Sequence, residues 1–115
     1  MTKREQLEHC KKWLRKNFPS EYQVRVYLSK PQLLKGDKGL TSWVSGEWQF
    51  EGRFVIRIAD NLNQDETIGV LLHEWGHVLR DHAPRDAHYD HHDEIHSVYA
   101  GRIWRIWTEE LRSDI

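Results

Sequence analysis

Two histidines and a glutamate in one short segment could bind and use a metal ion. His73, Glu74 and His77 stand in the order H-E-x-x-H within an apolar stretch that begins near Ile68. On a helix, residues i and i+4 share one face with their Cβ atoms about 6 Å apart, so both imidazoles can bind one ion. A carboxylate at Glu74 suits a general base acting on a metal-activated water better than a ligand. The spacing therefore predicts a site for one Zn²⁺, with Glu74 as the catalytic base.

A third protein ligand is expected, because catalytic zinc sites usually have three and leave one position open. The continuation H-E-x-x-H-x-x-G-x-x-H is absent, since Arg80 and Ala83 occupy its glycine and final histidine positions. The histidine-rich segment 81–93 and the first residues after it must supply the ligand. Several residues remain open on spacing alone: His82, His88, His91, His92, Glu94 and His96.

The elements that position these residues can be predicted from hydrophobic periodicity. Apolar residues at helical spacing predict helices over 3–17, 65–80 and 94–111, and Pro19 prevents the first from continuing. Alternating, β-branched and aromatic runs predict strands over 22–28, 40–44, 47–50 and 53–58. The order predicts an α+β fold with a small, three- to four-stranded, largely antiparallel sheet covered by helices. If the 53–58 strand forms the sheet edge above the site, an extended peptide could add to it.

Length and composition indicate one domain, residues 1–115, of a globular protein with 38% hydrophobic and 30% charged residues. No segment approaches the roughly 18 apolar residues needed to cross a bilayer, and the first residues lack the apolar core of a signal peptide. We therefore expect a cytoplasmic location and no membrane partner. Cys10 is the single cysteine, which excludes an internal disulfide and a thiolate metal cluster.

The charge balance gives no overall reason to expect nucleic-acid binding. The formal net charge is −1 at pH 7. Basic residues do gather in the first predicted helix, and phosphate contact is a possibility there, although such clusters are more often solvated helix faces. They are Lys3, Arg4, Lys11, Lys12, Arg15 and Lys16.

The two motifs together resemble those of the SprT-like metallopeptidases. In that family H-E-x-x-H is followed by H-G-x-E and a large apolar residue, and here the second motif is 91–95, His-His-Asp-Glu-Ile. His92 replaces the usual glycine and Ile95 a common aromatic. The resemblance covers about residues 55 to 107. It implies a minimal zincin-like fold, His91 as the third zinc ligand, and hydrolysis of peptide bonds in a protein or peptide substrate.

Two other interpretations stay open. The chain is also similar to gluzincins and to ImmA/IrrE-like metallopeptidases, which implies Glu94 as the third ligand, although the helical wheel puts Glu94 nearly opposite the apolar stripe. Alternatively, a closed site formed by His73, His77, His91 and His92 would make the domain a non-catalytic zinc-binding or regulatory module, because structural sites fill the fourth position.

Overall fold

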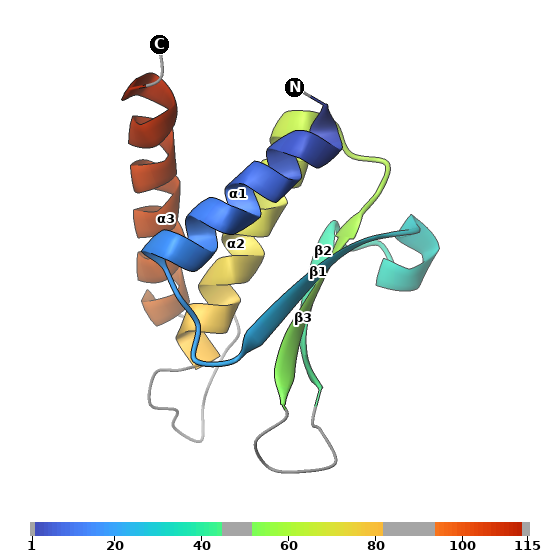
Figure 1. Ribbon diagram of the computed structural model, residues 1–115. Coiled ribbons are helices and arrows are strands. Elements are labelled where there is room, and N and C mark those ends of the chain that lie inside the picture. The colour runs from blue at the N-terminus through green and yellow to red at the C-terminus, as the bar shows by residue number, and fades with distance from the viewer. Residues whose placement is uncertain (1, 45–51, 82–93, 114–115) are drawn as a thin grey trace.

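The computed structural model of the chain describes residues 2–44, 52–81 and 94–113. Within these ranges three α-helices lie on one side of a three-stranded sheet, an α+β arrangement (Figure 1). The elements in chain order are α1 (Lys3–Asn17), β1 (Gln23–Ser29), the short 3₁₀ helix η1 (Pro31–Leu34), β2 (Gly39–Val44), β3 (Arg53–Ala59), α2 (Gln64–Asp81) and α3 (Glu94–Ser113).

The predicted helices are confirmed to within two residues, and local hydrogen bonds explain where two of them begin. Thr2 Oγ1 accepts the backbone N–H of Glu5 at 3.1 Å and the Glu5 carboxylate accepts that of Thr2 at 3.2 Å, which forms a capping box at α1. Asn63 Oδ1 accepts the backbone N–H of Glu66 at 2.8 Å at the start of α2.

The sheet is mixed, so the prediction of a largely antiparallel sheet was wrong. Its strand order is β1-β3-β2, with β1 parallel to β3 and β2 antiparallel to β3. Alternation along one strand shows which side chains face inward but not which strand lies beside it. The condition that the 53–58 strand forms an edge is not met, because β3 pairs on both sides and no peptide can add to it. The predicted strand 47–50 lies outside the described residues.

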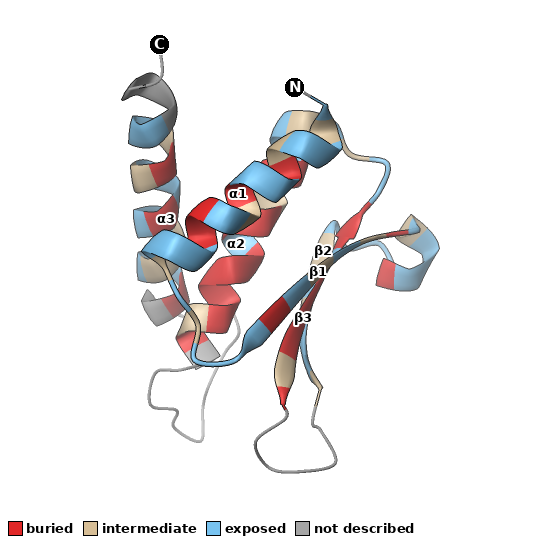
Figure 2. Cartoon of the chain, in the orientation of Figure 1, coloured by how far each residue is buried: buried red, intermediate tan, exposed pale blue. Residues whose placement is uncertain are grey.

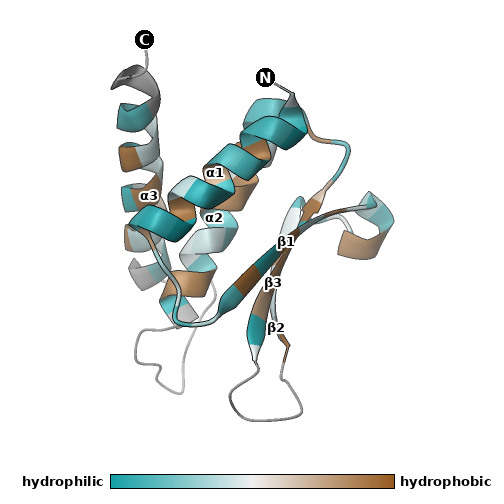
Figure 3. Ribbon diagram, viewed as in Figure 1, coloured by the Kyte–Doolittle hydropathy of each residue, from teal (hydrophilic) through white to brown (hydrophobic). Residues whose placement is uncertain are grey.

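Helix α2 is the central element of the fold. It packs against β2 and β3 on one side and against α1 and α3 on the others. Figure 2 shows buried residues along α2 and β3, and Figure 3 shows hydrophobic segments in the same places. The indole N–H of the fully buried Trp75 donates to the carbonyl of Phe18 at 2.9 Å, which ties α2 to the end of α1. The largest fully buried side chains are Trp75, Leu14, Ile56, Ile58, Leu71, Leu72 and Ile103.

Helix α3 turns part of its predicted apolar stripe, which comprises Ile95, Val98, Tyr99, Ile103, Ile106 and Trp107, toward the core. Ile103 and Trp107 are buried as predicted, but Val98 is 63% exposed. His96, which did not belong to that stripe, is buried as well. The histidine thus lies on the face of α3 that turns inward. Among the described residues, no helix is long and apolar enough to cross a membrane.

Candidate metal centre

Three histidines from two helices meet where α2 packs against α3. His73 and His77 come from successive turns of α2, and His96 comes from the first turn of α3. One nitrogen from each ring lies within 4.8 Å of those of the other two. The ring centroids of His77 and His96 are 4.0 Å apart with the rings stacked, and those of His73 and His96 are 4.8 Å apart. The three imidazoles therefore form one cluster that could hold a metal ion.

Contacts of the α2 backbone fix the position of His96. Its Nε2 lies 3.2 Å from the carbonyl oxygen of His73. A carbonyl only accepts, so Nε2 must carry the hydrogen of this bond, and the lone pair of the neutral ring is then on Nδ1. Metal-binding histidines commonly donate their other ring N–H to a backbone carbonyl, which fixes the tautomer and the ring orientation. The contact of His96 with the carbonyl oxygen of His73 is of this kind.

Gly76 allows α3 to approach α2 at this point. A Cβ atom built on Gly76 would lie 3.2 Å from His96 Nε2 and 3.2 Å from the Cβ of Ala100. Such contacts are tighter than ordinary van der Waals contacts. A side chain at position 76 would therefore push against the histidine that completes the cluster.

Glu74 lies beside the cluster and is held by strand β2. The residue is 6% exposed. Thr41 Oγ1 donates to Glu74 Oε2 at 2.8 Å. A Cβ at Gly39 would lie 3.1 Å from Glu74 Cγ and closer still to Val70. The strand thus supplies one hydroxyl donor and one position without a side chain, and together they leave room for a buried, oriented carboxylate.

The donor set fits a transition-metal ion. Neutral imidazoles suit zinc, copper, iron and nickel, whereas magnesium and calcium prefer sites built from oxygen donors. Zn–N bonds of about 2.0–2.1 Å in a tetrahedral site require nitrogens roughly 3.4 Å apart. The separations of up to 4.8 Å here would have to shorten for all three nitrogens to bind one ion. Three protein nitrogens would also leave a position for a small ligand.

The described residues contain part of the predicted site. His73, Glu74 and His77 lie together on α2 as predicted. His91 and His92 lie outside the described residues, and so do His82 and His88, so their roles stay predictions. Glu94 begins α3, but its side chain is outside the part that the structure describes.

Two residues of this site were missed or ranked low by sequence reasoning. His96 was one of several open candidates, although a histidine on the inward stripe of α3, four residues before Ala100 and seven before Ile103, was a usable signal. Thr41 was not considered. Thr41 reaches Glu74 only because β2 packs beside α2 in the folded chain, and no local spacing in the sequence indicates that contact.

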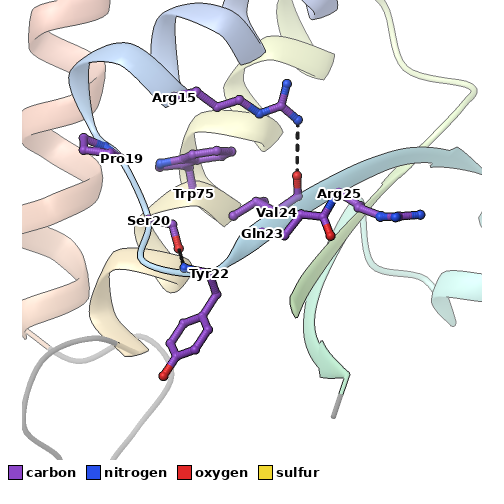
Figure 4. A pocket seen from close by; sticks show the side chains of 8 residues that line it. All are labelled: Arg15, Pro19, Ser20, Tyr22, Gln23, Val24, Arg25 and Trp75. Atoms are coloured by element: carbon purple, nitrogen blue, oxygen red, sulfur yellow. Dashed lines mark hydrogen bonds between the residues drawn. The ribbon is translucent and has the colours of Figure 1, made fainter. Parts of the chain in front are cut away.

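A separate pocket lies beside Trp75 of α2 (Figure 4). It has a volume of about 460 Å³ and is formed by the end of α1, the connection to β1 and the first residues of β1. Arg15 Nη2 donates to the carbonyl of Val24 at 3.2 Å across it. Among the described residues, its lining contains no histidine, cysteine or carboxylate. The lining residues are Arg15, Pro19, Ser20, Tyr22, Gln23, Val24, Arg25 and Trp75.

Comparisons with known proteins give no match: no family model, no curated protein and no solved structure matches the chain significantly. The function must therefore be argued from the site.

Proposed function

We propose that the protein is a zinc-dependent metallopeptidase with a minimal zincin-like fold. The observation that carries the proposal is the combination, at one place, of three clustered histidines and a buried glutamate in H-E-x-x-H spacing that accepts a hydrogen bond from Thr41. A structural metal site needs ligands alone. An oriented carboxylate next to three ligands is what hydrolysis requires in addition.

When bound, a zinc ion supplies Lewis acidity, which makes a water nucleophilic near neutral pH and polarises a peptide carbonyl. Glu74 is proposed to accept the proton that the attacking water loses. It then gives that proton to the nitrogen of the departing amine, so that the C–N bond breaks and a carboxylate and an amine result. The hydrogen bond from Thr41 to Oε2 orients the carboxylate for this transfer.

His96 is proposed as the third ligand. It lies with His73 and His77 in one cluster and is 3% exposed, so its polar ring is already desolvated beside them. The resemblance to SprT-like peptidases implies His91 instead, and that assignment remains the alternative proposal. The two can be separated by single substitutions.

The substrate is proposed to be an extended segment of an unfolded protein. Strand β2 pairs with β3 on one side and with no other described strand, so its outer edge can accept main-chain hydrogen bonds. The same strand carries Thr41, which donates to Glu74, and Gly39, where a Cβ would crowd the Glu74 side chain. A peptide added to β2 would therefore run past the catalytic carboxylate.

The proposal is tested with zinc-loaded wild type and the Glu74→Gln variant on fluorescently labelled, unfolded casein. We expect both proteins to bind one zinc ion with the same affinity. We expect the variant to cleave casein at least a hundredfold more slowly, because a general base typically contributes 10²–10⁴ in rate. Glu66→Gln is the matched control, since Glu66 is an exposed acid in the first turn of the same helix and should leave cleavage unchanged.

Equal cleavage by the Glu74→Gln variant would refute the role of Glu74. Absence of cleavage by the zinc-loaded wild type would favour the non-catalytic zinc-binding module instead.

A further inference from the structure

The face of the sheet that points away from the helices carries three arginines, and the described strands contribute no acidic residue to it. Strands β1, β2 and β3 contain Arg25, Arg53 and Arg57 but no aspartate or glutamate. Residues Val24, Phe54, Ile56 and Ile58, which alternate with them, pack into the core with the helices. All three arginines therefore project from the opposite face, where no α-helix lies (Figure 1).

The strand register brings the three arginines together. Arg25 on β1 is paired with Val55 on β3, and Arg53 and Arg57 are the residues two before and two after Val55. Such diagonal neighbours lie about 7–8 Å apart. Val55, which lies between Arg53 and Arg57 on this side of β3, is 6% exposed.

Tyr27 is at the centre of this charge. It is 41% exposed and is paired with Arg57, whose guanidinium carbon lies 5.5 Å from the centre of its ring. The pKa of Tyr27 is lowered by a hydrogen bond from Arg25 and by the charges of Arg25, Arg53 and Arg57. All three cations thus act at one exposed aromatic ring.

We propose that this arginine face, defined as Arg25, Tyr27, Arg53 and Arg57, binds single-stranded nucleic acid through its phosphates and stacks a base on Tyr27. Guanidinium groups bind phosphate oxygens in a bidentate manner, and an exposed aromatic ring on a sheet is a surface on which unpaired bases stack. Clustered charge of one sign produces a local attraction even in a chain whose net charge is −1.

An acidic protein segment could also bind these arginines, but it would have no use for the exposed ring of Tyr27.

A second basic surface could also bind nucleic acid, since α1 carries its own cluster of lysines. Lys12 and Lys16 are exposed there. An experiment must therefore separate the arginine face from α1 and phosphates from carboxylates.

The test is fluorescence anisotropy of a labelled single-stranded 20-mer, titrated with the full chain between 25 and 200 mM KCl. For three phosphate contacts we expect log K to fall with log[KCl] at a slope of about −2. The Arg25→Gln/Arg57→Gln variant removes two exposed charges and should reduce the slope to about −0.7. The Lys12→Gln/Lys16→Gln variant removes the same charge from α1 and should leave slope and affinity unchanged.

Tyr27→Ser separates stacking from charge. We expect it to weaken binding roughly fivefold or more while the slope stays the same. Circular dichroism of each variant shows that the fold is kept.

Three results would overturn the proposal. They are no binding by the wild type at 25 mM KCl, loss of binding in the α1 variant rather than the sheet variant, and competition by polyglutamate that equals competition by unlabelled oligonucleotide. The last would assign the face to acidic protein segments. Since no step depends on cleavage, the result is independent of the proposed peptidase activity.

Discussion

At the scale of single residues, Glu74 differs from an ordinary surface glutamate through its contacts with β2. It is buried, its Oε2 accepts the Thr41 hydroxyl at 2.8 Å, and Gly39 leaves space for its stem. Hydrogen bonds to charged groups contribute about 1.5–3 kcal/mol, and a buried carboxylate without such partners would be costly. Thr41 is therefore best understood as a positioning residue for the proposed base.

We expect Thr41→Val, which keeps the shape and removes the hydroxyl, to lower kcat about tenfold to a hundredfold with little change in KM. Thr41→Ser should restore most of the rate, because it restores the donor. Steady-state kinetics on a fluorogenic peptide and zinc affinity measured in parallel check this. A Thr41→Val enzyme with wild-type kcat would show that the hydroxyl only supports the fold.

At the scale of elements, the cluster of His73, His77 and His96 depends on how closely α3 packs against α2. His96 and Ala100 lie against Gly76, the one position within the H-E-x-x-H segment that has no side chain. Gly69, in the same helix, has no atom within 4 Å of the place its Cβ would take. The two glycines therefore have different structural roles, and substitution by alanine should have different effects at positions 69 and 76.

Gly69→Ala should stabilise the protein by up to about 1 kcal/mol, because alanine is the better helix former. Gly76→Ala should gain the same propensity but crowd His96, so we expect a weaker affinity for zinc and little or no gain in stability. Urea denaturation and zinc competition with a chelator measure both effects. Equal zinc affinity in the two variants would contradict the role assigned to Gly76.

The elements themselves were predictable, but their relative placement was not. Apolar residues at helical spacing located α1, α2 and α3, because burial of one stripe is visible in the local pattern. The parallel pairing of β1 with β3 and the inward rotation of α3 at His96 depend on contacts between distant segments. The exposed Val98 shows the limit clearly, since its apolar type favours burial but the packing of α3 leaves it in water.

At the scale of the whole molecule, the packing of α1 onto α2 closes the core around Cys10. Burial raises the pKa of the Cys10 thiol from 9.0 to about 12. The folded state therefore favours the protonated thiol. The Cys10 thiol does not affect the free energy of unfolding below about pH 9. That free energy falls as the pH rises from 9 toward 12, because the thiol of the unfolded chain loses its proton first.

We expect the wild type to lose about 2 kcal/mol more unfolding free energy than Cys10→Ala between pH 9 and pH 10.5. Cys10→Ala removes the thiol. The substitution also loses packing, but that loss is the same at both pH values, so it cancels when each protein is compared with itself. Urea denaturation at both pH values measures the difference. A parallel pH dependence in the two proteins would show that the thiol ionises as it does in water.

The central claim is that the fold assembles a metal site from both α2 and α3, and zinc affinity tests it most directly. His73, His77 and His96 are the described histidines that lie together, whereas the family resemblance implies His91. The measurement is the zinc dissociation constant of His96→Ala and His91→Ala, by competition with a chromophoric chelator at pH 7.5. We predict a loss of at least a hundredfold for His96→Ala and near wild-type affinity for His91→Ala. The reverse order, or unchanged affinity in both variants, would contradict the account.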